Sequence, residues 1–374
     1  KDNGSNYVES TSSSYTFNNL TSDATFYVKV YVKDSNNRES SVSATSIKTM
    51  IPRFDETCND NTLACHTAKL YTGTQGENGI YYHDATLTNG AGDNSYRFAG
   101  ASDQVNNYVC FGSATTPCPD DNLYRIIGVF DNKVGENQTE QRVKLIKSDY
   151  ATSALLDEDG DYKQAYTAAG NSSSNYKGNN LANIAGYNWN KTGQNSWSMS
   201  NLNKTNLNKN FITKIGADWA AKIDETTWKV GGNTYANIYS QPAKTAYQSE
   251  INHPVTTNSH DKATELEAKI GLMYASDYGF AAAPSAWTAN LKTYNGEAII
   301  NVNWMYMGLY EWTISRREDT PLRAYRAFGV DDTGSVISSF VDTNAFAVRP
   351  VFYLSSSVPY VSGDGTQSLP IRIN

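Results

Sequence analysis

The sequence predicts an α+β protein in which a small all-β module precedes one larger domain of short, twisted antiparallel strands, helices and long loops. Three observations support this class. Near the N-terminus, the segment "TFYVKVYVKD" alternates between two faces, as β-strands do. A later segment repeats its apolar residues every four positions, as a helix does. Asn, Ser, Thr, Gly and 26 Tyr are abundant while only 18% of residues are charged, which is typical of extracellular proteins with many polar turns.

The N-terminal module contains a clear strand in "TFYVKVYVKD". Phe26, Val28, Val30 and Val32 fall on one face, and the alternate Tyr and Lys residues fall on the other. This alternation indicates a half-buried strand.

The linker "KTMIPRFDE" follows, in which Pro52 ends a strand. We therefore place the β module at residues 1–50 and the larger domain at residues 51–374.

The larger domain is predicted to begin with the cysteine-bearing segment and to contain a hairpin made by "LYRIIGVF" and "QRVKLIKSDYA". The clearest helix is "NKTNLNKNFITKIGADWAAKI", which Thr205 is placed to cap and Gly216 is placed to interrupt. Two shorter helices are expected near residues 243–251 and 263–268. Strands and tight turns return in "AIINVNWMYMGLYEWTIS", "AYRAFGV" and "VRPVFYLSSS".

The four cysteines form two local brackets, Cys58 with Cys65 and Cys110 with Cys118. Pairing within each bracket is the favoured one of the three possible connectivities, and each bond would stabilise the fold by roughly 2–3 kcal/mol. A zinc site is the alternative, but the spacings are longer than C-x2-C and His66 is a lone companion. Disulfides indicate an oxidising, extracellular compartment.

The charge balance limits the possible partners. A net charge of −7 and a pI near 5.2 argue against a nucleic-acid partner, because phosphates need a basic face. No apolar run approaches the length of a membrane span, and no signal peptide is visible. We also expect no cofactor.

Motifs for catalysis and metal binding are weak. Asp157, Asp159 and Asp161 alternate in "LLDEDGDY" and could hold calcium, but the EF-hand Gly and Glu positions do not match, so a solvated turn is favoured. The four histidines, which lie outside any metal or triad motif, are His66, His83, His253 and His260. The common hydrolase, metalloprotease and nucleotide motifs are missing, and we expect a protein that is not an enzyme.

Two tryptophans, Trp189 and Trp197, lie in "YNWNKTGQNSWSMSN". Their ring faces could stack on sugars, but structural packing is the favoured interpretation.

The segment "WTISRREDTPLRAYRAFGV", from Trp312 to Val330, gathers arginines and large apolar groups. Alternation along "RAYRAFGV" sends Arg326, Phe328 and Val330 to one face. Arginine is rarely buried without a partner, and arginine mixed with aromatic rings is the composition of a protein-binding hot spot. The alternative is a solvated surface on which the arginines pair with nearby aspartates. The residues predicted to form the ligand face are Arg316, Arg317, Asp319, Leu322, Arg323, Tyr325, Arg326, Phe328, Val330, Asp332, Ser335, Ile337, Ser339, Phe340, Asn344 and Phe346.

Several motifs carry a resemblance to a known family: "LYRIIGVF", "KIGLMYASDYGFA", "NWMYMGLYEWTIS", "AVRPVFYL" and "SGDGTQSLPIRIN". Their order resembles the C-type-lectin-like fold shared with formylglycine-generating enzymes, and more closely the variable proteins targeted by diversity-generating retroelements of bacteria and phages. Residues 1–50 resemble the second half of a fibronectin type III module, with Phe26 at the usual corner Tyr position.

The resemblance implies that a stretch upstream of the final "RPVF" is mutated at adenine-bearing codons and displayed on one face. Products of the common Asn codon never include Lys, Gln, Glu, Met or Trp. Residues 313–348 contain no Lys, Gln, Met or Trp and only one Glu, Glu318, and the last lysine of the chain is Lys292. This composition fits diversification.

The sequence therefore predicts a surface-displayed adhesin or receptor-binding protein, on a cell surface or a phage particle. Its partner would be a protein or glycan on another cell or host surface. Two alternatives stay open. One is a non-diversified carbohydrate-binding head, and the other is an enzyme of the formylglycine-generating group. That enzyme needs a cysteine pair near its C-terminal active site, whereas all four cysteines here precede residue 119.

Overall fold

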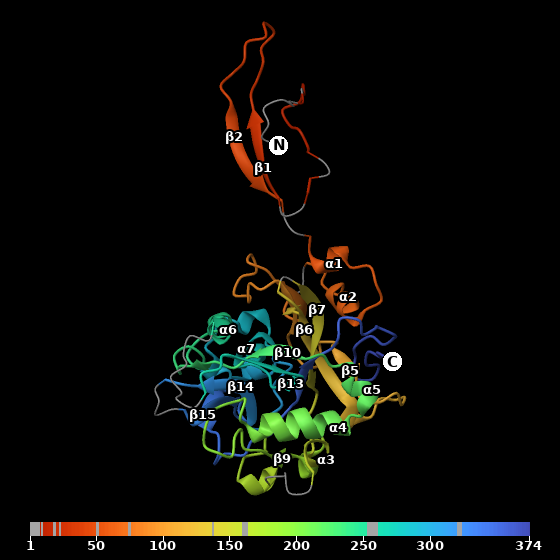
Figure 1. Cartoon of the computed structure of the whole chain (residues 1–374), viewed down its shortest axis with the longest axis vertical. Helices are drawn as coiled ribbons and strands as arrows, with labels where there is room; N and C mark the ends of the chain where they lie inside the picture. The colour runs from red at the N-terminus through yellow and green to blue at the C-terminus, as the bar shows by residue number, and fades with distance from the viewer. Residues whose placement is uncertain are drawn as a thin grey trace. The chain divides into compact units, whose positions relative to one another are not determined.

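The computed structural model describes most of the chain, which divides into two compact units, Lys1–Asn59 and Asp60–Asn374 (Figure 1). The described residues are 8, 10–17, 20–21, 24–49, 52–73, 76–136, 138–158, 164–252, 261–319 and 324–374. Each unit mixes strands with helical segments, so the chain as a whole is α+β.

The first unit contains one antiparallel strand pair, β1 (Thr25–Val30) with β2 (Ser43–Lys48). A short helix, α1 (Phe54–Thr57), follows. The predicted alternation is visible where Phe26 is partly buried, but Val30 is 57% exposed. The strand is therefore less buried than predicted, because the described part of this unit offers only one partner strand and no second layer to cover its apolar face.

A seven-stranded antiparallel sheet is the framework of the second unit. Its strand order is β13-β17-β7-β6-β4-β3, and β5 pairs with β6. The predicted hairpin is its centre, β6 with β7, and is confirmed. The bounds are β3 (Gly79–His83), β4 (Ser95–Ala99), β5 (Tyr108–Cys110), β6 (Leu123–Lys133), β7 (Thr139–Lys147), β13 (Ile270–Gly271) and β17 (Val351–Tyr353).

A second sheet of four strands has the order β11-β14-β15-β16. The β11–β14 pair is parallel, whereas the other two pairs are antiparallel. Its bounds are β11 (Gly232–Asn233), β14 (Glu311–Arg317), β15 (Arg326–Val330) and β16 (Val336–Phe340). Two smaller pairs complete the strands: β8 (Gln164–Ala165) with β9 (Ala185–Gly186), and β10 (Thr226–Lys229) with β12 (Glu265–Ala268).

The predicted long helix is present, with one correction at its start. A helical segment with π-type hydrogen bonds, η4 (Leu202–Phe211), continues into α4 (Ile212–Lys214). Gly216 then adopts a φ of 84° and interrupts the helix, as predicted. Thr205 is not the cap, because the helix begins earlier and the Oγ of Ser200 accepts the backbone N–H of Asn203 at 3.2 Å. Few apolar residues precede Leu207 at helical spacing, so the sequence pattern did not reveal the first turn of the helix.

The two shorter predicted helices have opposite outcomes. The one near residues 243–251 is confirmed as α6 (Ala243–Asn252). The one near residues 263–268 is wrong, because this segment is strand β12. Its backbone pairs with β10 and sets Leu266 opposite Trp228, so a long-range partner overrides the local helical preference. The other helical segments are α2 (Leu63–Ala68), α3 (Ser153–Leu156), α5 (Ala217–Ala220), α7 (Ala275–Phe280), α8 (Glu297–Ile300) and the 3₁₀ turns Asp120–Asn122, Tyr166–Ala169, Leu181–Asn183, Pro284–Ala286 and Leu291–Thr293.

A buried ion pair links the four-stranded sheet to the segment that enters β17. The Nε and Nη2 atoms of Arg349 donate to the two carboxylate oxygens of Glu311, both at 2.8 Å. Nη2 also donates to the carbonyl of Met305 at 2.7 Å. The arginine of the "AVRPVFYL" motif is therefore a structural residue, fixed by a two-pronged contact in the interior.

Both predicted disulfides are present, Cys58 with Cys65 and Cys110 with Cys118. The Cα atoms of the second pair are 5.8 Å apart. Because every cysteine is bonded, the zinc alternative has no thiolates left to use.

Throughout the described residues, every helix falls short of the length and apolar character that a membrane crossing requires.

We expect Gly128→Ala to destabilise the protein by about 1–3 kcal/mol. Gly128 lies where the β6–β7 register shifts, and an added Cβ would collide with the carbonyl oxygen of Tyr96 on β4. The measurement is urea unfolding followed by tryptophan fluorescence. Gly135→Ala is the control, since its Cβ would make only an ordinary contact with Gln138. Equal stability losses for the two variants would contradict this account.

Candidate functional site

The segment 313–348, predicted as a ligand face, forms β14, β15 and β16 of the four-stranded sheet. The strand register sets Arg317 opposite Arg326, and Arg326 opposite Phe340. Directly paired residues of neighbouring strands project from the same face of a sheet. Three of the predicted residues therefore form one row across three strands.

This row has an exposed end that gathers cations and rings. The guanidinium carbon of Arg326 is 3.9 Å from the ring centre of Phe340, which is 39% exposed. The rings of Tyr325 and Phe340 are stacked with centres 5.4 Å apart. Arg317 lies 4.0 Å from the ring centre of Tyr235 and pairs with Asp319. We call the surface formed by Tyr235, Arg317, Tyr325, Arg326 and Phe340 the arginine–aromatic surface.

Tyr235 is a member of this surface that the sequence analysis missed. Its segment follows β11, whose parallel pairing with β14 carries Tyr235 to Arg317. The neighbouring Tyr239 packs on it with ring centres 4.2 Å apart. Two tyrosines four residues apart in "NTYANIY" were the available signal, but nothing local connects that segment with residues 313–348.

Arg316 is a correction, because it is buried and only 1% exposed. Its Nη1 lies 3.5 Å from a carboxylate oxygen of Asp261, and its Nη2 lies 3.4 Å from one of Glu318. Nη2 also donates to the backbone carbonyl of Asp261 at 3.2 Å. Internal carboxylates balance the charge of this guanidinium, so Arg316 belongs to the interior.

Five further residues of the predicted face are also buried: Phe328, Val330, Asp332, Ser335 and Phe346. Phe346 packs on Trp312 with ring centres 4.3 Å apart, and the ring centres of Phe328 and Tyr235 are 6.3 Å apart. The alternation placed Phe328 correctly beside Arg326 on one face. It could not show that other segments cover the central part of that face.

The remaining predicted residues fall into two groups. Ile337, Ser339 and Asn344 are partly exposed on or near β16. Leu322 and Arg323 lie outside the described residues.

In the described segments, the candidate calcium-binding aspartates and the histidines do not gather into a metal site. Asp157 accepts a hydrogen bond from the Asn206 amide at 3.2 Å, and Asp159 and Asp161 lie outside the described residues. No cluster of three or more His, Cys, Asp or Glu side chains able to hold a metal occurs in the described residues.

The described histidines have structural contacts. His66 stacks on Tyr360 with ring centres 3.6 Å apart. His83 is buried and its Nδ1 accepts the backbone N–H of Ala91 at 3.0 Å. Burial and the charge of Arg97 lower the pKa of His83 to about 3, so it stays neutral at physiological pH. His253 and His260 lie outside the described residues.

The two tryptophans of the Asn-rich segment are core residues, which confirms structural packing. Trp189 and Trp197 are both fully buried, with ring centres 4.9 Å apart. The indole N–H of Trp189 donates to the carbonyl of Thr313 at 2.9 Å.

A cavity of about 910 Å³ forms a second concentration of polar groups, distinct from the arginine–aromatic surface. It lies beside the β6–β7 hairpin, β10, β12 and α6. Its lining includes Phe130, Asp131, Tyr247, Glu265 and Glu267. The sequence analysis did not identify any of these residues as part of a site.

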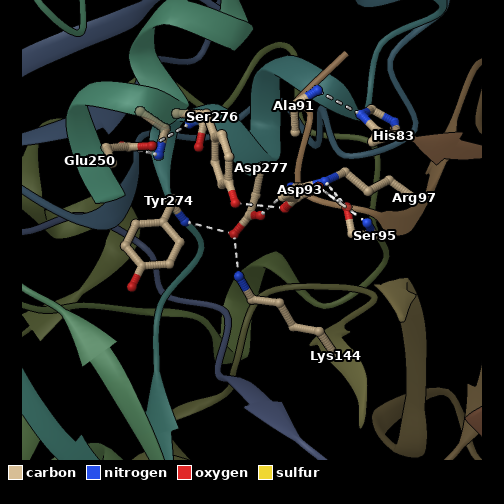
Figure 2. A network of polar contacts seen from close by, with 12 residues as sticks. His83, Ala91, Asp93, Ser95, Arg97, Lys144, Glu250, Tyr274, Ser276 and Asp277 are labelled. Carbon is tan, nitrogen blue, oxygen red and sulfur yellow. Dashed lines mark hydrogen bonds and ion pairs between the residues drawn. The ribbon is translucent and has the colours of Figure 1, made fainter. Parts of the chain in front are cut away.

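A buried ionic network lines this cavity (Figure 2). Lys144 Nζ contacts a carboxylate oxygen of Asp277 at 2.5 Å. Arg97 contacts the other oxygen of Asp277 at 3.4 Å and Asp93 at 2.6 Å. Burial alone would raise the pKa of Asp93, but the charge of Arg97 holds it well below its usual range. Two cations and two carboxylates thus balance in the interior.

Glu250 on α6 lies in the same network and has the more unusual environment (Figure 2). Its oxygens accept the backbone N–H groups of Ala275 at 3.0 Å and Ser276 at 3.2 Å, at the start of α7. It also accepts from the Ser315 hydroxyl. Burial raises the pKa of Glu250 to about 7, although these hydrogen bonds oppose the shift.

No protein-family model, curated protein or solved structure matches the chain.

We expect Arg316→Ala to destabilise the protein by about 3–5 kcal/mol, because it leaves buried carboxylates without their cation. The matched variant Arg326→Ala removes an arginine from the partly exposed end of the same sheet. It should cost less than about 1 kcal/mol. Both are measured by urea unfolding. A similar, small loss for the two variants would place Arg316 on the surface instead.

We expect Glu250→Gln to change the pH dependence of stability. The folded pKa of about 7 lies above the usual 4.5. Between these values the folded state retains a proton that the unfolded state has released. The free energy of unfolding of the wild type should therefore fall as pH rises through this window, by roughly 3 kcal/mol from this group.

The Gln variant lacks this titration, so its stability relative to the wild type should improve from pH 4.5 to 7. Any constant cost of the substitution leaves this slope unchanged. Glu136→Gln, on the exposed hairpin loop, is the control and should follow the wild type. Parallel profiles for wild type and Glu250→Gln would show that Glu250 does not have a raised pKa.

Proposed function

We propose that this chain is a surface-displayed ligand-binding protein of the adhesin or receptor-binding type, with a C-type-lectin-like ligand-binding unit. The observation that carries the proposal is the row of Arg317, Arg326 and Phe340 across three strands, which is partly covered at Arg317 and exposed at Phe340. Stacked rings present a large apolar contact at low entropic cost, and guanidinium groups add forked donors. Rigid strands hold these groups before any ligand arrives, which reduces the entropic cost of binding.

Because several residues of the ligand face predicted from the sequence are buried, the proposed binding surface contains fewer residues. Arg316, Phe328 and Phe346 support the sheet from within, and their replacement would cost packing or leave buried charges unpaired. The predicted binding surface is therefore reduced to the arginine–aromatic surface together with Ile337, Ser339 and Asn344, which are partly or fully exposed.

We further propose that residues 313–348 are the target of a diversity-generating retroelement. The composition of this segment supports the idea, since it lacks Lys, Gln, Met and Trp. The two disulfides agree with display outside the cell. The ligand is a protein or glycan, and no nucleic acid is expected, given the net charge of −7.

Binding is tested with the Arg326→Ala and Phe340→Ala variants. The chain is labelled and applied to arrays of glycans and of cell-surface proteins, and bound partners are then quantified by surface plasmon resonance. Each substitution should weaken binding by at least tenfold, which corresponds to about 1.4 kcal/mol. The control is Glu136→Gln on the exposed β6–β7 hairpin loop, which contributes no residue to this surface. Partners whose affinity is unchanged by both substitutions would exclude this surface as the binding site.

Diversification is tested at the locus and in sibling sequences. A neighbouring reverse-transcriptase gene and an imperfect repeat of codons 313–348 should be present. Siblings should differ at Arg317, Arg326 and Phe340 and keep Arg316 and Phe328. Identical residues at all five positions, without a repeat, would reject diversification while leaving the binding proposal intact.

A further inference from the structure

Among the described residues, the closest buried contact between a lysine amine and a carboxyl group joins two elements that are far apart in the sequence. Lys144 lies on β7 and Asp277 in the first turn of α7, 133 residues later. Their nitrogen and oxygen atoms are 2.5 Å apart, and the two side chains are 1% and 3% exposed. The Lys144–Asp277 contact is visible at the centre of Figure 2.

Aromatic rings surround the amine of Lys144. Its Nζ lies 4.8 Å from the ring centre of Tyr274, 5.5 Å from those of Phe130 and Tyr353, and 5.7 Å from that of Trp228. Ring faces within about 6 Å attract an ammonium, whereas removal of the amine from water favours its neutral form. Burial accordingly lowers the pKa of Lys144, although the charge of Asp277 opposes the shift. A desolvated lysine amine is a stronger nucleophile at neutral pH.

We propose that Lys144 and Asp277 condense into an intramolecular isopeptide bond between Nζ and Cγ. The amine lone pair attacks Cγ of the carboxyl group, the new C–N bond forms, and one C–O bond breaks. One of the three ammonium protons of Lys144 passes to the carboxyl group before the attack, and a second leaves the nitrogen after it. The leaving oxygen departs as water with these two protons, and the amide nitrogen keeps the third. An ammonium and a carboxylate thus give a neutral amide and one water molecule, and no oxidant, reductant or cofactor is needed.

The charges around the pair remain balanced after this reaction. Before it, Lys144 and Arg97 are matched by Asp277 and Asp93. Afterwards, Arg97 keeps Asp93 at 2.6 Å, and the new amide is neutral. The remaining oxygen of Asp277 still accepts hydrogen bonds, for which the N–H of Tyr274 is in place. Condensation therefore removes one ion pair from an interior where holding separated charges is costly.

Glu250 adds a group that can exchange a proton near this pair. It interacts electrostatically with both Lys144 and Asp277. It binds the backbone N–H groups of the same α7 turn that carries Asp277. Its environment leaves both protonation states accessible near neutral pH. We assign it a supporting role, because its contacts are to the helix turn and not to the reacting atoms.

The consequence of the bond would be mechanical and thermodynamic. It would fasten α7 to the central hairpin strand of the seven-stranded sheet and close a covalent loop between residues separated by 133 positions in the sequence. Cross-links over long loops restrict the unfolded chain most. This inference does not depend on the proposed function, since it concerns the interior and not the arginine–aromatic surface.

The test is the mass of the purified full chain after incubation at neutral pH, followed by denaturation and reduction of the disulfides. An isopeptide bond lowers the mass by about 18 Da, the mass of one water. After trypsin, the peptide Val143–Lys147 should be uncut at Lys144 and joined to the peptide Ile270–Lys292. A full-length mass with cleavage after Lys144, or a loss of water confined to a single peptide, would overturn the proposal.

Matched variants separate this reaction from other losses of water. Lys144→Arg keeps a cation beside Asp277 but has no amine to acylate, and Asp277→Ala removes the acceptor. Both should show the unmodified mass of their own sequence, whether or not they fold. Glu250→Gln should slow the appearance of the cross-link at least several-fold. Lys229 contacts Glu265 at an exposed site and serves as the internal control, since it should remain cleavable.

Discussion

The two-pronged contact between Arg349 and Glu311 is the constraint on which the second unit depends. It joins the first residue of β14 to the segment that enters β17, and so connects the four-stranded and seven-stranded sheets through one fully desolvated pair. Such a pair costs solvation energy but is strict about geometry, because both prongs must align. It fixes where β14 starts, and the register of β14 with β15 and β16 then determines which side chains share the exposed row.

Burial divides neighbouring residues of segment 313–348 into an interior group and an outward group. Arg316 and Arg317 are adjacent, yet the first turns inward to Asp261 and the second meets Tyr235 near the surface. Along β15, Arg326 reaches the exposed end while Phe328 is covered. The sheet therefore separates a supporting interior from a small set of outward groups. Variation among the outward groups would leave the packed interior unchanged, which is the physical requirement for a scaffold that tolerates altered binding residues.

Elements that depend on interactions between residues close in the sequence could be predicted from the sequence. The β6–β7 hairpin, the helix interrupted at Gly216 and the two cysteine brackets all have short-range signals. Long-range pairing decided the rest. The strand at Glu265–Ala268 follows from its partner β10, and the interior position of Arg316 depends on a carboxylate 55 residues away. The association of Lys144 with Asp277 spans 133 residues. Sequence periodicity cannot predict such contacts, because they form only when distant elements pack together.

The parallel pairing of β11 with β14 has a consequence for any repertoire built on this surface. Tyr235 lies outside residues 313–348, so its ring would be the same in every version of the protein. The side chain at position 317 would always contact this same tyrosine ring. Contact with the ring favours cationic and planar side chains over small or acidic ones. Sampling at that position would thus be chemically biased even if the mutations themselves were random.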